Sequence, residues 1–198
     1  KKLCGTLINN LLKENKTWFK LSFTLQNNIR QILWAQLLSP RADIISIKFF
    51  GNILGNLIMI EFEENNFNML KKSIELFPSM VELSQESFSG QKTICYLSIL
   101  YTLSIFFEEL SFKNLKLDEK IIENITDNLV WFFGKNEIVF KCNNENLIIA
   151  PLNLTTNLLP YLRNITDERL KAIFTLICNF IQANIMKIRT SRFGEAIM

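Results

Sequence analysis

The chain has 198 residues, of which 48% are hydrophobic and 21% are charged, so it can bury a core and is not intrinsically disordered. Its 22 basic and 19 acidic residues give a net charge of +3, which is too small and too mixed to indicate a nucleic-acid-binding protein. The sequence contains no histidine, which excludes Ser-His-Asp and Cys-His catalytic arrangements and histidine metal sites.

The first residues and the cysteines favour an intracellular section of a larger protein. We interpret Lys1, in place of methionine, as the start of an excised domain. The apolar stretch near the N-terminus is interrupted by polar residues and lacks the small-residue cleavage site of a signal peptide. The cysteines lie far apart and form no Cys-x-x-Cys pair, so we expect reduced thiols and a cytoplasmic or nuclear location. They are Cys4, Cys95, Cys142 and Cys178.

Apolar residues recur at helical spacing along the whole chain, and sustained alternation is hard to find, so the sequence predicts an all-α fold. Helix-stopping stretches such as Ser39-Pro40 and Ser89-Gly90 separate the segments. Asp43, Asp118 and Thr166 are the predicted N-caps. The predicted helices cover residues 2–14, 18–38 (which a break near Ser22 would divide), 43–63, 66–84 (interrupted at Pro78), 91–111, 118–133, 146–162 and 167–188.

Residues 136–150 leave two alternatives open. Ile138-Val139-Phe140 favours a β-strand and Asn143-Asn144 favours a turn, so the stretch is either a hairpin or a loop between two helices.

The stretch FFGNILGNLIMI, residues 49–60, carries Gly51 and Gly55 one helical turn apart, which opens a shallow groove for another helix. Its uncharged run has 12 residues, and the next such run, residues 93–107, has 15. A membrane span needs about 20 predominantly apolar residues, so both runs fall short. We therefore predict a helix contact within the molecule rather than a membrane dimer. The helix at 91–111 is apolar on nearly all sides, which predicts that it lies at the centre of the fold.

The ends of successive predicted helices recur about every 25 residues, or about every 50 per antiparallel pair. Two segments, LQNNIRQILWAQLLSP (25–40) and DIISIKFFGNILGNLIMIEF (43–62), resemble the long inner helix of an armadillo-type repeat, with an apolar ladder closed by Leu-Leu or Leu-Ile. The chain is thus similar to armadillo and HEAT repeat proteins. The resemblance implies one domain over residues 1–198, a right-handed solenoid section of stacked antiparallel helical hairpins. A non-repetitive helical bundle is the alternative.

No catalytic or cofactor motif is visible. The sequence has no phosphate-binding loop, and its acidic pairs, such as Glu108 and Glu109, fall at helix ends where solvated charges are usual. We therefore expect no enzyme activity, no metal and no cofactor. Armadillo proteins that bind nuclear import signals place Asn four residues after Trp, but Ser22, Leu38 and Lys135 stand at those positions here, so import-type cargo binding is not indicated.

The remaining interpretation is an intracellular scaffold that binds another protein or peptide. Tryptophan and arginine are enriched among interface hot spots, so the candidate partner-binding residues are Arg30, Trp34, Trp131 and Phe133. The alternatives are a membrane-associated α-helical protein, and weak nucleic-acid binding through the C-terminal basic cluster. That cluster comprises Lys187, Arg189 and Arg192.

Overall fold

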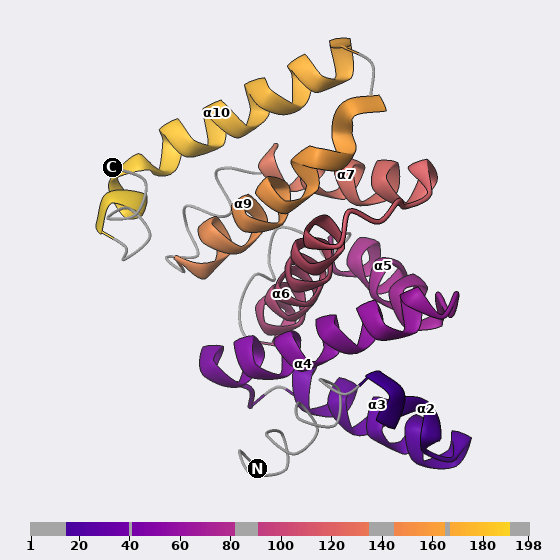
Figure 1. The fold of residues 1–198 in the computed structure, drawn as a ribbon. Helices are drawn as coiled ribbons and strands as arrows, with labels where there is room; N and C mark the ends of the chain where they lie inside the picture. Colours follow the sequence, from indigo (N-terminus) through magenta and orange to yellow (C-terminus); the bar gives the residue numbers. More distant parts are fainter. Residues whose placement is uncertain (1–14, 40, 82–90, 135–144, 165–166, 191–198) are drawn as a thin grey trace.

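The computed structural model describes residues 15–39, 41–81, 91–134, 145–164 and 167–190 (Figure 1). All regular structure in these ranges is helical, which confirms the all-α prediction. The elements are α2 (Asn15–Lys20), α3 (Phe23–Leu37), α4 (Ile44–Glu63), α5 (Asn68–Val81), α6 (Gln91–Phe112), α7 (Glu119–Phe133), α9 (Asn146–Leu158), the 3₁₀ helix η1 (Leu159–Asn164) and α10 (Asp167–Thr190).

Local sequence signals explain several helix boundaries. The break near Ser22 is confirmed, since Ser22 caps α3 and its side chain accepts a hydrogen bond from the Leu25 N–H at 3.3 Å. Asp43 caps α4 in the same way, through the Ser46 N–H at 2.7 Å. Asp118 caps α7 through the Lys120 N–H at 2.9 Å. The third predicted cap, Thr166, lies outside the described residues.

Other boundaries differ from the prediction. Helix α5 continues through Pro78 to Val81, so the predicted interruption is wrong. A proline removes one backbone donor, so α5 lacks one hydrogen bond at Pro78, and the helix ends three residues later at Val81. The predicted helix at 2–14 lies outside the described residues, as do residues 135–144. Residues 146–150 are helical, so no hairpin extends over them.

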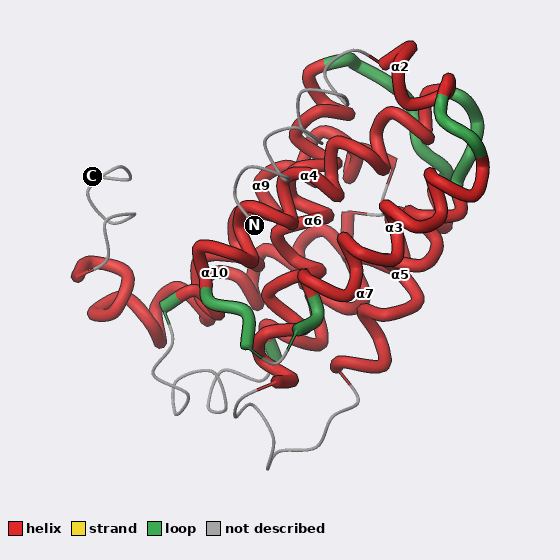
Figure 2. Tube along the Cα trace, turned by 90° about the horizontal axis from the view of Figure 1, so that it is seen from below, coloured by secondary structure: helices red, strands yellow, loops and turns green. Residues whose placement is uncertain are grey.

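The longer helices lie in two rows. Helices α4, α6 and α9 lie side by side in one row, and α5, α7 and α10 form the other (Figure 1). Helix α3 packs against α4 at one end of the molecule, and α10 lies at the opposite end. In Figure 2 the loops among the described residues are short, so successive helices must fold back on one another.

Helix α6 lies at the centre, as its sequence predicts. It contacts α4, α5 and α9, and Leu97, Leu100 and Phe106 are among its buried residues. Its small polar side chains are also buried and hydrogen-bonded: the Ser98 hydroxyl donates to the Leu37 carbonyl at 2.8 Å, and the Thr102 hydroxyl donates to the Ser98 carbonyl at 2.8 Å. Both hydroxyl groups therefore have hydrogen-bond partners although they are buried.

The two glycines of the 49–60 stretch set the contact between α4 and α6. Gly51 and Gly55 face α6, and a Cβ atom at Gly55 would lie 2.8 Å from the Thr102 carbonyl oxygen and 2.8 Å from the Ile105 Cβ. At Gly51 the nearest atom would be the Tyr101 Cβ at 3.3 Å. The predicted contact within the molecule is thus confirmed, because only glycine permits this approach.

The register between α4 and α6 is constant. Gly51 and Gly55 meet residues 50 positions later in the chain, and Lys113 lies 50 positions after its partner Glu63. The two helices therefore run parallel. Helix α9 packs on α6 with less regular offsets. The Tyr101 hydroxyl donates to the Asn146 side-chain oxygen, 45 positions later, at 3.3 Å, and the Asn157 side-chain amide donates to the Ser104 carbonyl, 53 positions earlier, at 2.9 Å.

Helices α4 and α6 end in the same way, at the turns that lead to α5 and α7. Asn65 and Asn114 adopt left-handed conformations, with φ of 59° and 52°. After each of them a backbone N–H returns to a carbonyl five residues earlier, from Asn66 to Glu61 at 2.8 Å and from Leu115 to Leu110 at 3.2 Å. Both turns are Schellman motifs, in which asparagine takes the place usually held by glycine.

Helices α4 and α6 each contain a 20-residue stretch, Ile44–Glu63 and Thr93–Phe112, that is long and apolar enough to cross a membrane. The prediction that both segments are too short to cross a membrane rested on the length of their uncharged runs. The helices are longer than those runs. The most apolar windows of the two stretches are 61% and 67% buried inside the molecule.

We expect Gly55→Ala to destabilise the protein by about 1–3 kcal/mol, because the added methyl group meets the α6 backbone. Gly51→Ala should cost less, since its neighbour is a side-chain atom and alanine favours a helix by about 1 kcal/mol over glycine. Urea unfolding followed by circular dichroism measures both. A Gly55→Ala protein as stable as the wild type would contradict the close packing of α4 on α6.

Candidate functional site

Two grooves lie on either side of the α4–α5 turn. The first, which we name the α3–α5 groove, has a volume of about 300 Å³ and contains two of the residues that the sequence singled out, Arg30 and Trp34. Its lining residues are Phe23, Asn27, Arg30, Gln31, Trp34, Asn66, Asn68, Met69 and Lys72.

A buried ion pair lies behind this groove. Arg30 of α3 donates from Nε to the Glu61 Oε1 atom at 2.8 Å and from Nη2 to the same oxygen at 2.5 Å. Its Nη1 atom donates to the Asn27 side-chain oxygen at 2.7 Å, and its guanidinium carbon lies 5.4 Å from the centre of the Trp18 ring. Arg30 is therefore fixed on three sides and joins α2, α3 and α4.

Burial raises the pKa of Glu61 from its ordinary value of 4.5, and the hydrogen bonds and charge of Arg30 act against that rise. Trp18 also lowers this pKa as a hydrogen-bond donor. The Trp18 Nε1 and Glu61 Oε2 atoms are both buried, and neither makes a hydrogen bond of ordinary distance and angle. We infer that these two atoms face each other in a loose geometry.

Trp34 forms part of the floor of the α3–α5 groove and Lys72 part of its rim. The Trp34 side chain is buried, and the Lys72 Nζ atom lies 5.3 Å from the centre of its ring. Phe23, which the sequence analysis did not select, is 73% exposed. Its position directly after the N-cap Ser22 is the signal that was missed, because the first residue of a helix has no preceding turn to cover it.

The other predicted residues lie elsewhere. Phe133 is buried in the core, where its ring centre lies 5.0 Å from that of Phe180, and Trp131 is half-buried on α7. Lys187 and Arg189 belong to the last turns of α10, with side chains outside the described set, and Arg192 lies outside the described residues. Partner binding by these residues stays a prediction.

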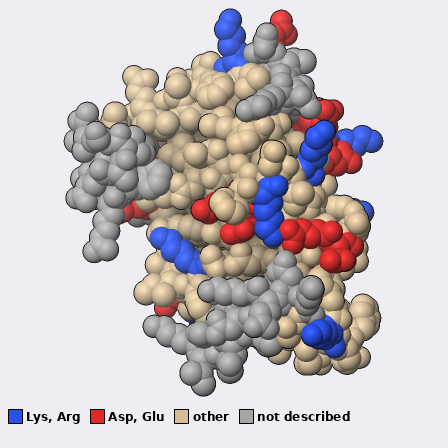
Figure 3. Space-filling model, viewed as in Figure 1, with Lys and Arg blue, Asp and Glu red and all other residues tan. Residues whose placement is uncertain are grey.

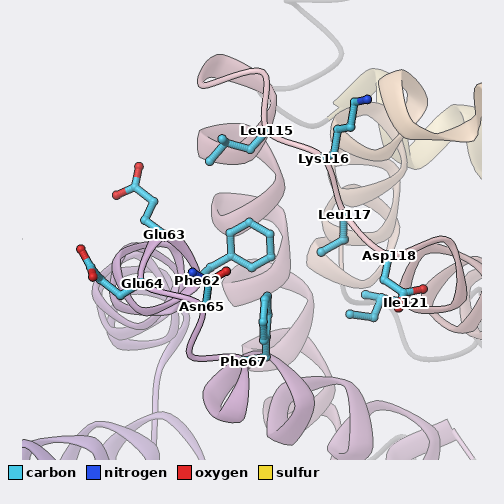
Figure 4. A pocket seen from close by; sticks show the side chains of 10 residues that line it. All are labelled: Phe62, Glu63, Glu64, Asn65, Phe67, Leu115, Lys116, Leu117, Asp118 and Ile121. Carbon is cyan, nitrogen blue, oxygen red and sulfur yellow. The ribbon is translucent and has the colours of Figure 1, made fainter.

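The second groove lies between the α4–α5 and α6–α7 connections and has a volume of about 570 Å³ (Figure 4). The Phe62 and Phe67 rings lie in it, with their centres 5.2 Å apart in an edge-to-face arrangement. The Glu63 and Glu64 carboxylates point away from the rings in Figure 4. Its lining residues are Phe62, Glu63, Glu64, Asn65, Phe67, Leu115, Lys116, Leu117, Asp118 and Ile121.

Two of the acidic groups of the second groove have partners within the molecule. Lys113 binds Glu63 at 2.5 Å, and Asp118 caps α7. Within the described ranges, no group of three or more histidine, cysteine, aspartate or glutamate residues is placed to hold a metal ion. The residues that line the two grooves do not bring together a nucleophile, a base and an oxyanion donor.

No family model, curated protein or solved structure matches this chain. Its function must therefore be argued from the geometry of its own residues.

We expect Arg30→Met to destabilise the protein by about 3–5 kcal/mol at pH 7, because it leaves an ionised Glu61 buried without its counter-ion. The folded-state pKa of Glu61 is already above its unfolded value of 4.5, and removing Arg30 raises it further. The folded protein then binds the proton more tightly than the unfolded chain. The loss relative to the wild type therefore grows as the pH rises from the wild-type folded-state pKa of Glu61 to the higher pKa of the variant, and it is smallest at low pH, where Glu61 is protonated in both proteins.

Urea unfolding at pH 4 and pH 7 measures this loss. Lys113→Met is the matched control, because it breaks the partly exposed pair with Glu63 and should cost less than about 1 kcal/mol. Equal losses for the two variants at pH 7 would contradict the importance of the buried pair.

Proposed function

We propose that this chain is a non-catalytic scaffold domain of the armadillo/HEAT-like type, a section of a right-handed helical solenoid that binds another protein in the cytoplasm or nucleus. The two rows of helices, the parallel register of about 50 residues and the repeated Schellman turns support this proposal. A register that recurs along the chain is typical of stacked repeats, in which each hairpin packs on the previous one.

The α3–α5 groove is the proposed binding site, and the pairing of its charges carries this assignment. The Arg30 charge is matched by Glu61, whereas Lys72 forms no ion pair among the described residues. The groove therefore favours a partner segment with a carboxylate for Lys72. The exposed Phe23 ring favours an apolar side chain on the same segment.

Side-chain amides supply the remaining polar contacts of the groove. Gln31 and Asn68 are exposed and line it together with Asn66. An amide both donates and accepts, so such a row suits the alternating N–H and C=O groups of an extended backbone. The proposed ligand is thus an extended peptide segment that carries an acidic and an apolar side chain.

Selection of random peptides displayed on phage against the purified domain tests this proposal. We expect the selected peptides to be enriched in Asp and Glu next to an apolar residue, and to lose binding to Lys72→Glu and Phe23→Ala. Lys72 and Phe23 are better choices than Arg30 or Trp34, whose replacement also disturbs the fold.

Phe112→Ala is the matched control, because Phe112 is 88% exposed and lies outside both grooves. Peptides without acidic residues, or equal binding to wild type and Lys72→Glu, would contradict the proposed site. If no peptide is enriched over an unrelated helical domain, the groove does not bind extended segments.

A membrane-associated protein is the second candidate, because α4 and α6 have the length and composition of membrane spans. The face of α4 that carries Gly51 and Gly55 is used by α6, which favours the first candidate. Carbonate extraction of membranes from cells that express the domain distinguishes the two. We expect the domain to be released into the supernatant, whereas a control integral membrane protein stays in the pellet. Retention of the domain in the pellet would favour the second candidate.

A further inference from the structure

The turn between α2 and α3 carries exposed apolar side chains on both sides. Phe19 in α2 is 42% exposed, and Phe23 and Leu25 in the first turn of α3 are 73% and 46% exposed. Leu21 and Ser22 alone separate the two helices, so the three side chains lie around one short turn. We name this set of three residues the α2–α3 tip. Phe23 also borders the α3–α5 groove, whereas Phe19 and Leu25 line neither groove.

The part of the chain that contains the α2–α3 tip holds an excess of positive charge. Residues 1–42 have seven basic residues and one acidic residue, a net charge of +6, whereas the rest of the chain has 15 basic and 18 acidic residues, a net charge of −3. Lys20 and Arg41 are exposed, and the described part of this segment contains no acidic residue. The first acidic residue after it, Asp43, caps α4. This end of the molecule therefore attracts an anionic partner.

The acidic side chains of α4, on which α3 packs, do not cancel this charge. Arg30 binds Glu61, and Lys113 binds Glu63. Of the acidic residues in α4 and at its C-cap, only Glu64 has no ion pair among the described residues. In Figure 3 the lower right of the molecule, where α2 and α3 lie, shows basic and uncharged side chains and no acidic ones.

We propose that the α2–α3 tip binds the surface of an anionic membrane. Exposed phenylalanine and leucine side chains enter the boundary between lipid headgroups and acyl chains, and basic side chains beside them bind the anionic headgroups. Lys20, which lies between Phe19 and Phe23 in the sequence, is placed for the second role. A single-stranded nucleic acid is less suited to this surface, because its bases stack on aromatic rings and gain little from an exposed leucine.

This contact is peripheral, so α4 and α6 stay inside the molecule and no helix spans the membrane. It also does not depend on the proposed peptide site. Phe23 belongs to both surfaces, and the variants that test the membrane contact therefore change Phe19 and Leu25 instead.

Co-sedimentation of the purified chain with phosphatidylcholine vesicles that contain or lack phosphatidylserine tests the proposal. We expect binding that requires phosphatidylserine. The double variant Phe19→Ala/Leu25→Ala should weaken this binding by about tenfold or more, because it removes two of the three apolar side chains of the tip. Phe174→Ala/Ile185→Ala is the matched control, because these side chains of α10 are 46% and 40% exposed at the opposite end of the molecule. Far-UV circular dichroism checks that all variants fold alike.

A charge reversal tests the role of the basic side chains. Lys20→Glu should weaken binding to the same vesicles by about fivefold or more, and Lys120→Glu, at an exposed position of α7, should not. No binding to phosphatidylserine vesicles, or an equal loss in the two alanine variants, would overturn the proposal. Binding to a single-stranded oligonucleotide without binding to vesicles would assign the basic end to nucleic acid and would also overturn it.

A fluorescent label reads whether the tip itself enters the lipid. In a chain whose native cysteines are replaced by serine, an NBD dye attached through Phe19→Cys should brighten when phosphatidylserine vesicles are added, because its emission rises in apolar surroundings. The same dye attached through Phe174→Cys should not respond. An equal response at the two positions would show that the α2–α3 tip is not the part that enters the membrane.

Discussion

The close approach of α4 and α6 positions the helices around them. Gly51 and Gly55 let the α4 backbone come within contact distance of α6, and a side chain at Gly55 would meet the Thr102 carbonyl directly. This contact fixes the parallel register of the two helices, which in turn brings Glu63 to Lys113 at their far ends. The α4–α5 and α6–α7 turns therefore lie on the same edge, where the second groove forms between them.

The buried Arg30–Glu61 pair plays a different part, because it joins the first helices to this packed row. A buried charge is costly to desolvate, and burial raises the pKa of Glu61 even with Arg30 in contact. The pair thus contributes little net stability. It still requires the two side chains to meet, because either charge alone would be buried without a counter-ion. It holds α3 in place beside α5, and the α3–α5 groove is the space that this placement leaves.

Exposed apolar side chains are uneven along the molecule. Phe23 on α3 and Phe174 on α10 are exposed at the two ends, whereas most of α6 between them is buried. The exceptions between the ends include Ile45 at the start of α4 and Phe112, the last residue of α6. In stacked helices each unit covers its neighbour, so terminal helices keep surface that an inner helix would bury. The proposed peptide site lies at the α3 end of the molecule.

Spacing and capping residues act over a few neighbouring positions, so the helical class, the glycine contact, the central helix and two caps were predictable from the sequence alone. Which side chains remain accessible depends on tertiary packing. Arg30 and Trp34 look like exposed anchors in the sequence, yet Glu61, 31 positions after Arg30, draws Arg30 inward, and Lys72 of α5 covers the Trp34 ring. Phe23, Phe174 and Ile185 appear ordinary in the sequence and are exposed because no neighbouring helix among the described residues covers them. Burial depends on contacts between residues far apart in the chain, and no local pattern reports those contacts.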